Sequence, residues 1–352
     1  MTDSGPHAER FARQTRFAAL GEDGQERLAG STVLVVGAGA LGGSSALWLA
    51  RAGVGRLIVV DRDIVEVSNL PRQVLFTEEH ARNGTPKAFA AAEALRAVGG
   101  PTVVEPHATH LGPTELATLG RNVDLVLDGT DNMRTRYLVN DWCVREGKPW
   151  VYGGVVSSGG LVLPIEPGKG PCLRCVFRDP PPPASLPTCD TAGVIGPAVG
   201  LVASMQAGLA LRILAERPRA EGDGAGRGDR APLLELDAWR GDARRIDVPR
   251  DPSCPCCGER SFPFLDDADD VEAVSLCGRN TVQVLGGGPR VDGSELVGRL
   301  AGAGVEARAL GPLVRFEADG HRFTVFADGR TLVEGTEDTG RALSLVARWV
   351  GA

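Results

Sequence analysis

A chain of 352 residues, with 43% hydrophobic and 24% charged residues, has the composition of a globular protein with room for one large α/β domain and a smaller one. Its net charge of −7 at pH 7 and its lack of a long basic run argue against nucleic acid as the main ligand. Residues 1–13 are polar and show no secretory signal, so we expect a cytoplasmic protein. There, eight cysteines favour metal binding or catalysis over disulfides.

Strand and helix patterns alternate through the first part of the chain. After a helical stretch over 10–30, the sequence predicts strands at 32–37, 56–61, 102–106 and 123–128, and helices at 41–52, 85–98 and 132–147. This alternation is typical of a doubly wound, Rossmann-like, mainly parallel sheet, which binds ligands at the carboxyl ends of its strands. Strand pairs then predict an antiparallel extension, at 151–152 and 161–164 and near 233–238 and 243–248.

An uncharged stretch of 18 residues, Val194 to Leu211, lies between these strand pairs. It is rich in Gly and Ala, whereas a membrane span needs about 20 strongly apolar residues. We therefore expect a buried helix and no membrane. Such a helix would bury well against a copy of itself, so we also expect a homodimer.

Composition divides the chain into three parts. We predict a main domain over 1–262, an acidic linker over 263–272 and a small α+β domain over 273–352. For the last part the sequence predicts a strand at 281–285, a helix at 293–302, strands near 305–317 and 322–334, and a helix at 338–349.

A Gly-Ala-Gly-Ala-Leu-Gly motif closes the first predicted strand and opens a helix, as in the dinucleotide fingerprint. Backbone N–H groups at Gly37, Gly39 and Gly42, with the following helix N-terminus, favour a bound phosphate. Ala40 puts a methyl group where some such loops have glycine. Asp61 ends the second strand, where a carboxylate can accept both ribose hydroxyls.

Two cations and a second acidic cluster distinguish a reacting nucleotide from a redox cofactor. Transfer of a nucleotidyl group builds charge on pyrophosphate and calls for fixed cations, here Arg72 and Lys87. Asp131, after the fourth strand, suits Mg²⁺, and the adjacent Asn132 suits either the nucleotide or a helix cap. Solvated surface cations and an NAD-dependent oxidoreductase remain the alternatives at this point.

Two C-x-x-C pairs supply a predicted zinc site. Cys172, Cys175, Cys254 and Cys257 give four thiolates for a closed, structural tetrahedral site, with redox chemistry as the alternative. Cys256 lies inside the second pair, so the sequence leaves the ligand register there open.

For two further residues the sequence allows either a role in catalysis or a role without any chemistry. Cys189 precedes a predicted helix N-terminus and is a candidate nucleophile or sulfur acceptor, or else a small packed residue. Arg13 lies on the N-terminal helical stretch and is either solvated or positioned to reach the phosphates of a neighbouring subunit.

In this order, the motifs resemble those of the MoeB/ThiF family, relatives of ubiquitin-activating enzymes, over roughly residues 9 to 258. The resemblance rests on the glycine loop, both cysteine pairs and the short motifs Arg10-Phe11-x-Arg13-Gln14, Asp61-x-Asp63, Ser68-Asn69-Leu70-x-Arg72-Gln73, Gly84-x-Pro86-Lys87 and Thr130-Asp131-Asn132. The run of prolines at 180–183 and Ala40 depart from the commonest family pattern.

The resemblance implies ATP-dependent adenylylation of the C-terminal glycine of a ubiquitin-like sulfur-carrier protein ending in Gly-Gly, which leads to its thiocarboxylation. It implies ATP, Mg²⁺ and Zn²⁺ as cofactors and a sulfur donor, either a sulfurtransferase or a desulfurase, as a further partner. It also implies that Asp61 holds the ribose, that Ser68, Asn69, Arg72 and Lys87 hold the nucleotide, that Asp131 binds Mg²⁺, and that Arg13 acts across a dimer interface. A member that adenylates a non-protein carboxylate is the alternative within the family.

Overall fold

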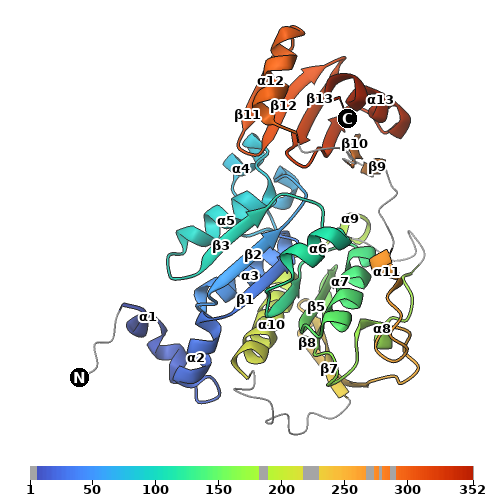
Figure 1. The fold of residues 1–352 in the computed structure, drawn as a ribbon. Coiled ribbons are helices and arrows are strands. Elements are labelled where there is room, and N and C mark those ends of the chain that lie inside the picture. The colour runs from blue at the N-terminus through green and yellow to red at the C-terminus, as the bar shows by residue number, and fades with distance from the viewer. Residues whose placement is uncertain are drawn as a thin grey trace. The chain divides into compact units, whose positions relative to one another are not determined.

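The computed structural model describes residues 6–181, 189–216, 230–266, 273–276, 280–285 and 291–351. The chain divides into two compact units, Met1–Asp266 and Asp267–Ala352, and each has a sheet of its own (Figure 1). The first unit contains every residue for which the sequence predicts a role in binding or catalysis.

The sheet of the first unit contains eight strands within the described residues, in the order β3-β2-β1-β4-β5-β6-β7-β8. They are β1 (Thr32–Val36), β2 (Arg56–Val60), β3 (Val103–His107), β4 (Leu125–Asp128), β5 (Trp150–Val156), β6 (Gly159–Ile165), β7 (Arg230–Asp237) and β8 (Asp242–Pro249). The strands from β1 to β5 pair in parallel, and β6, β7 and β8 pair antiparallel. The prediction of a mainly parallel, doubly wound sheet with an antiparallel extension is confirmed.

Helices connect these strands. They are α1 (Pro6–Thr15), α2 (Gly21–Ala29), α3 (Ala40–Arg51), the 3-10 helix η1 (Val67–Asn69), α4 (Glu78–Asn83), α5 (Lys87–Ala97), α6 (Pro113–Leu119), α7 (Met133–Glu146), α8 (Leu173–Val176), α9 (Cys189–Ala192), α10 (Gly196–Ala215) and α11 (Pro263–Asp266). The helical stretch expected over 10–30 is interrupted between α1 and α2. The sequence did not predict the short helices η1, α4, α6, α8, α9 and α11.

Successive side chains of β1 enter two different cores, because side chains alternate across a strand. Val33 and Val35 pack in a core shared with α3, α5 and α10. Leu34 and Val36 pack in a core shared with α6 and α7. The sheet is therefore the middle layer of three, with helices on both faces (Figure 1).

Helix α10 is long and apolar enough to cross a membrane by length and composition. In the structure one side of it packs against α3, β5 and β6, and buried residues run along its length from Ala198 to Ala215. It is the buried core helix that the sequence predicts.

The second unit is a six-stranded antiparallel sheet, among the residues described, in the order β11-β12-β13-β14-β10-β9. Its elements are β9 (Ala273–Leu276), β10 (Thr281–Val284), α12 (Gly293–Gly302), β11 (Ala307–Leu310), β12 (Leu313–Ala318), β13 (His321–Phe326), β14 (Thr331–Glu334) and α13 (Thr339–Trp349). Both helices contribute to a single apolar core with the sheet.

Two predicted strands of this unit are shorter than expected. The stretches 305–317 and 322–334 each fold into two strands joined by a turn, with Gly311 (φ +59) and Gly329 (φ +85) in the left-handed conformation that a tight turn requires. Within the acidic linker expected over 263–272, Pro263–Asp266 form α11 at the end of the first unit, and residues 267–272 lie outside the described part.

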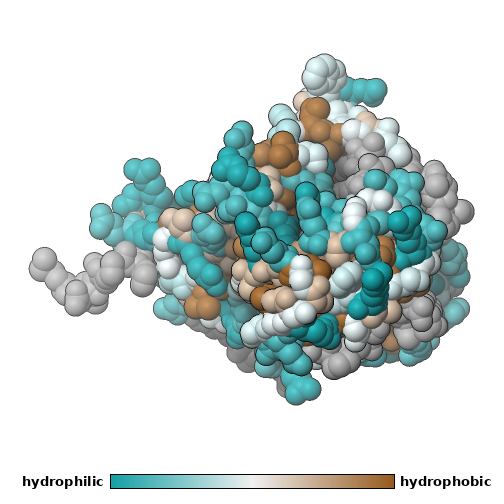
Figure 2. Space-filling model, turned by 90° about the horizontal axis from the view of Figure 1, so that it is seen from above, coloured by the Kyte–Doolittle hydropathy of each residue, from teal (hydrophilic) through white to brown (hydrophobic). Residues whose placement is uncertain are grey.

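The surface carries both hydrophilic and hydrophobic residues. On the face drawn in Figure 2, hydrophilic residues surround smaller hydrophobic areas. Large apolar side chains that are strongly exposed include Trp239 and Phe17.

Candidate functional site

The candidate site lies where β1, β2 and β4 end. These neighbouring strands are parallel, so their carboxyl ends meet at one edge of the sheet. The glycine loop follows β1, Asp61 follows β2, and Asp131 lies three residues after β4. The structure thus brings the nucleotide-binding candidates of these three loops to a common edge.

Each glycine of the loop has its own structural reason. Gly37 has a φ of +88°, and a Cβ there would lie 2.7 Å from the Gly129 carbonyl oxygen. A Cβ on Gly42 would lie 1.9 Å from the Gly37 oxygen, so the fold excludes any side chain there. A Cβ on Gly39 would meet nothing closer than Gln73 Nε2 at 3.8 Å. Packing thus requires glycine at 37 and 42, whereas Gly39 leaves space that a ligand can use.

Helix α3 begins immediately after this space, with Ala40 as its first residue and Gly39 as its N-cap. No side chain caps its first turn, so the first backbone N–H groups of the helix are not used by a cap. Uncapped N–H groups and the helix dipole favour an anion at this end.

Asp61 ties the loop after β2 to the glycine loop. Its Oδ2 accepts a hydrogen bond from the Ala38 N–H at 2.7 Å, and its Oδ1 accepts one from the Asp63 N–H at 2.7 Å. Burial raises the pKa of the Asp61 carboxyl, while the nearby Lys87 charge lowers it. Each carboxylate oxygen retains a further lone pair, which suits the predicted contact with ribose hydroxyls.

Lys87 is a buried cation and not a solvated one. It is the first residue of α5, only 6% exposed, and its Nζ donates to Asp63 Oδ2 at 3.0 Å. Burial lowers the pKa of Lys87, but the carboxylates of Asp63, Asp61 and Asp131 outweigh this and raise it above its ordinary value. The site therefore contains an ammonium group that is charged at neutral pH and that the Asp63 contact holds in place.

The turn that precedes α4 supplies the other cation. Asn69 is buried, and its Oδ1 accepts from the Glu66 N–H at 3.1 Å, which closes the 3-10 turn. Arg72 is partly exposed, and its Nη1 donates to the Ser68 carbonyl at 2.7 Å. This bond uses part of the guanidinium, whose remaining N–H groups suit a phosphate.

Gln73 is a residue that sequence reasoning included in a motif without assigning it a role. Its side chain is 6% exposed and lies closest to the open space at Gly39. Its Oε1 has no hydrogen-bond partner in the described structure. The sequence motif contains Gln73, but only its burial beside Gly39 in the fold indicates a role for it.

The loop after β4 is rigid up to Asp131. Asp128 is buried and accepts hydrogen bonds from the Thr130 N–H (2.9 Å), the Thr130 hydroxyl (2.8 Å) and Arg136 Nε (3.0 Å). Asn132 caps α7 through the Arg134 N–H at 2.9 Å, which is the alternative that the sequence left open. Asp131 is exposed between them, and its charge helps to raise the pKa of Lys87.

Arg13 lies away from this edge. Helix α1 is fixed by Phe11, which packs under Gly53, and by Gln14, whose Nε2 donates to the Ala52 carbonyl at 2.9 Å. Ala52 and Gly53 follow the last residue of α3, whereas the glycine loop precedes its first residue, about 18 Å away along a helix of this length. The structure therefore does not bring exposed Arg13 to the nucleotide site of its own chain.

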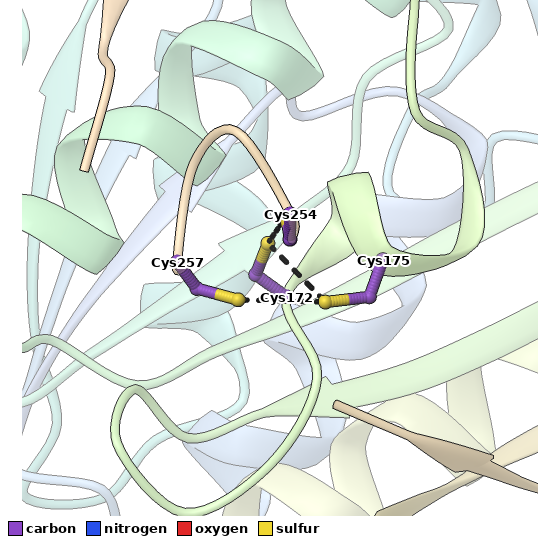
Figure 3. Close-up of side chains that lie close together, drawn as sticks. All are labelled: Cys172, Cys175, Cys254 and Cys257. Atoms are coloured by element: carbon purple, nitrogen blue, oxygen red, sulfur yellow. Dashed lines mark hydrogen bonds between the residues drawn. The ribbon is translucent and has the colours of Figure 1, made fainter. Parts of the chain in front are cut away.

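The four predicted cysteine ligands form a compact cluster (Figure 3). Their sulfur atoms all lie within 4.8 Å of one another, with 3.5 Å between Cys172 and Cys254 and 3.4 Å between Cys175 and Cys257. A tetrahedral ion with Zn–S bonds of about 2.3 Å needs S–S separations of about 3.8 Å. The residues therefore fit a four-thiolate zinc site, and the sulfur atoms that the second pair contributes to this cluster are those of Cys254 and Cys257.

Of the two remaining predicted site residues, Ser68 is described in full and Cys189 only in part. Cys189 is the first residue of α9, and its side chain lies outside the described part of the structure. Ser68 is exposed in η1, and its hydroxyl donates to Glu66 at 3.3 Å.

Comparison with known proteins shows which family has this sequence pattern. Residues 11–256 match the model of the ThiF family. The chain belongs to the ThiF family. Its relatives include the sulfur carrier protein ThiS adenylyltransferase of Bacillus subtilis, which is 39% identical over 346 residues, or 97% of this chain and 99% of that protein.

A second relative of this ThiF-family chain is the sulfur carrier protein adenylyltransferase of Thermus thermophilus, which is 42% identical over 275 residues, or 77% of this chain and 96% of that protein. Among solved structures, E. coli MccB with MccA-N7isoASN matches with a TM-score of 0.60 and 21% identity over 71% of this chain and 75% of that chain, which shows a shared fold. The Bacillus relative spans both units, so the small second unit is shared beyond this chain.

Proposed function

We propose that this ThiF-family enzyme uses ATP to adenylate the C-terminal glycine carboxylate of a small ubiquitin-like sulfur-carrier protein ending in Gly-Gly. The observation that carries the proposal is the buried Lys87 ammonium at the strand edge that also holds the glycine loop. A redox enzyme needs no such cation, whereas pyrophosphate departure does. The names of relatives as adenylyltransferases of sulfur carriers support the same choice.

The reaction is an in-line displacement. A carboxylate oxygen of the carrier forms a bond to the α-phosphorus, and the bond from the α-phosphorus to the bridging oxygen of the β-phosphate breaks. The products are an acyl-adenylate and pyrophosphate. Lys87 and Arg72 would neutralise the leaving pyrophosphate, and Asp61 would hold the ribose, so that catalysis consists of positioning and charge stabilisation.

Two metal ions would serve this chemistry in different ways. Exposed Asp131, beside Lys87, would hold a Mg²⁺ ion against phosphate oxygens, because carboxylate oxygens suit that ion. The four cysteines would hold Zn²⁺ in a closed site without an open position for water, so this metal would be structural.

A homodimer would complete the site. Arg13 lies at the far end of α3 from the glycine loop, so it would reach phosphates only in a second copy of the chain. Helix α10 exposes Leu201 (39%) and Met205 (37%) on the side away from the sheet, and a Cβ on Gly200 or Gly208 would meet no atom within 4 Å. A second copy is the occupant we propose for this apolar stripe.

Sulfur transfer would follow adenylylation. A sulfurtransferase or desulfurase would pass its persulfide sulfur to Cys189, the proposed sulfur acceptor on this chain. The terminal sulfur of the Cys189 persulfide would then displace AMP from the acyl-adenylate to give an acyl disulfide, and a thiol reductant would cleave this disulfide to release the thiocarboxylate. MOCS3 of Sus scrofa, named an adenylyltransferase and sulfurtransferase, is 43% identical over 270 residues, and the chain spans 56% of it.

The test is exchange of labelled pyrophosphate into ATP with a purified Gly-Gly carrier. Exchange should require the carrier and its terminal carboxylate, and Arg72→Ala should abolish it. Exchange without carrier, or exchange with a non-protein carboxylate alone, would overturn the protein substrate. A saturable fluorescence change with NADH, but none with ATP analogues, would instead favour the oxidoreductase.

A further inference from the structure

Helix α7 runs from the candidate nucleotide site to the cysteine cluster. Asp131 and the cap residue Asn132 immediately precede its first residue. Eight residues after the cap, Asn140 lies fully buried against both cysteine loops. At 1.5 Å per residue, Asn132 and Asn140 are about 12 Å apart along the axis. One short helix therefore contacts both places.

Arg136 fixes the first half of α7 to the nucleotide site. Its Nε donates to Asp128 at 3.0 Å, and its Nη2 donates to the carbonyls of Thr130 (2.5 Å) and Gly153 (2.9 Å). The guanidinium also lies 5.2 Å from the centre of the Tyr152 ring. This buried network joins α7, β4 and β5, so a shift of the helix moves the turn that carries Asp131.

Asn140 fixes the second half of α7 to both halves of the metal centre. Its Oδ1 accepts from the Leu173 N–H at 2.9 Å, inside the first cysteine pair. Its Nδ2 donates to Cys256 Sγ at 3.2 Å, inside the second pair. Since both ends of one buried amide are used, the position of α7 and the positions of the two cysteine loops depend on one another.

We propose that Asn140 is a positioning residue that couples the four-cysteine metal centre, through α7, to Asp131 in the nucleotide site. This inference rests on the proposed function, in which Asp131 holds the Mg²⁺ of Mg-ATP. The coupling acts on the magnesium-dependent part of nucleotide affinity, because Asp131 is the group that α7 positions. Residues that orient metal-binding loops without touching the metal commonly change metal affinity or activity by about 10- to 100-fold.

The test compares three variants of the zinc-loaded protein. Asn140→Leu removes both hydrogen bonds at similar volume, and Asn140→Asp keeps the acceptor for Leu173. The control is Arg178→Ala, because exposed Arg178 contacts Asp251 (3.4 Å) and the Ser253 carbonyl (3.3 Å) beside the second cysteine pair, and none of the hydrogen bonds or ion pairs recorded for Arg178 in the described structure reaches α7. Elemental analysis confirms zinc content, and calorimetry measures the affinity of a non-hydrolysable ATP analogue with and without Mg²⁺.

We expect every variant to retain one zinc ion per chain. Asn140→Leu should weaken binding of the magnesium complex at least fivefold, a size typical of coupling between sites, and change magnesium-free binding less than twofold. The affinity of Asn140→Asp for the magnesium complex should lie between those of the wild type and Asn140→Leu. Arg178→Ala should bind the complex as tightly as the wild type.

Three results would overturn the coupling. Zinc-loaded Asn140→Leu could bind the ATP analogue with unchanged affinity, or it could lose the same affinity with and without Mg²⁺. Arg178→Ala could also lose as much affinity as Asn140→Leu. If Asn140→Leu does not fold, the comparison of Asn140→Asp with Arg178→Ala decides by the same criteria. A wild-type protein that binds no ATP analogue would contradict the proposed function itself, whereas normal wild-type binding with unaffected Asn140 variants would overturn the coupling only.

Discussion

The Lys87 ammonium lies 3.0 Å from the Asp63 carboxylate, and the backbone N–H of Lys87 donates to the Asp63 carbonyl at 2.8 Å. Two bonds between the same two residues hold the cation at the N-terminus of α5, where the helix dipole alone would disfavour it. The pairing explains how a lysine is kept charged and in a fixed position before any nucleotide arrives.

Replacement of Lys87 separates the effect of its charge on the reaction from its effect on stability. Lys87→Met should reduce pyrophosphate exchange by at least about 100-fold, because one preorganised charge-stabilising donor commonly contributes that much. The variant removes the buried cation that contacts Asp63 at 3.0 Å, so the melting temperature should also fall. The double variant with Asp63→Asn should recover part of the stability but none of the exchange; recovery of exchange would remove Lys87 from the reaction.

Two glycines of the same loop should respond in opposite ways. Gly42→Ala places a Cβ 1.9 Å from a backbone oxygen and should prevent stable folding. Gly39→Ala meets nothing within 3.8 Å and should keep the melting temperature within a few degrees while it weakens ATP binding at least tenfold. Thermal unfolding and calorimetry on both variants test this. A Gly39→Ala protein with wild-type affinity would show that no phosphate approaches this position.

Alkaline pH should destabilise the fold through two groups. Burial raises the pKa of Tyr137 to about 12 from 10.0, so the unfolded chain loses this proton first and stability falls as pH rises between these values. Lys87 has a raised pKa, so its contribution is complete below 10.5 and is lost as pH rises through the higher folded value.

Tyr137→Phe isolates the tyrosine contribution. It removes the hydrogen bond to the Phe177 carbonyl (2.8 Å), which should cost about 1 kcal/mol at pH 7, but it should flatten the loss of stability above pH 10. Urea unfolding at pH 7 and pH 11 measures both. An unchanged slope with pH would contradict burial as the cause.

Metal removal should distinguish the five clustered thiols. Cys175→Ser should lose the bound metal and a large part of the stability, because structural zinc contributes to folding directly. Cys256→Ser should retain one metal ion per chain, because its sulfur accepts from Asn140 instead. Elemental analysis after gel filtration gives the answer, and loss of metal from both variants would place Cys256 among the ligands.

Mixed dimers test the role of Arg13. Arg13→Ala and Lys87→Met should each be inactive, yet a mixture should recover about a quarter of wild-type exchange, since random pairing gives half heterodimers with one complete site each. Leu201→Glu with Met205→Glu should yield a monomer by light scattering and abolish this recovery. Full activity of Arg13→Ala would show that Arg13 does not act in trans.

The repeating elements of the first unit were predictable because their signals are local. Val33 and Leu34 lie in different cores, so both faces of β1 are buried and its sequence is a continuous apolar run that predicts a strand. The glycine spacing then predicts the turn that follows. The cysteine ligands also follow from spacing. Helix α4, by contrast, is a six-residue helix whose sequence EEHARN shows no apolar face, so its only signals are at its ends: the Thr77 cap, the acidic first turn and Gly84 after its last residue.

Contacts between distant segments explain what the sequence could not reveal. Arg136 appears in sequence as one more arginine on a helix, and only the fold brings Asp128 and Gly153 to it. Gln73 acquires its place beside Gly39 in the same way. A contact between a polar side chain and residues far away in the chain leaves no local sequence pattern. The roles of these two residues can therefore be recognised only in the fold.

Gly37, Gly42 and Gly129 meet backbone to backbone: a Cβ on Gly129 would lie 2.3 Å from the Gly37 oxygen and 2.6 Å from the Gly42 Cα. The loops that follow β1 and β4 thus pack backbone against backbone, with no side chain between them. The glycine loop, where we propose that phosphates bind, is therefore held in shape by its own backbone contacts. Little entropy remains to be lost there on binding, and more of the interaction energy of a nucleotide appears as affinity.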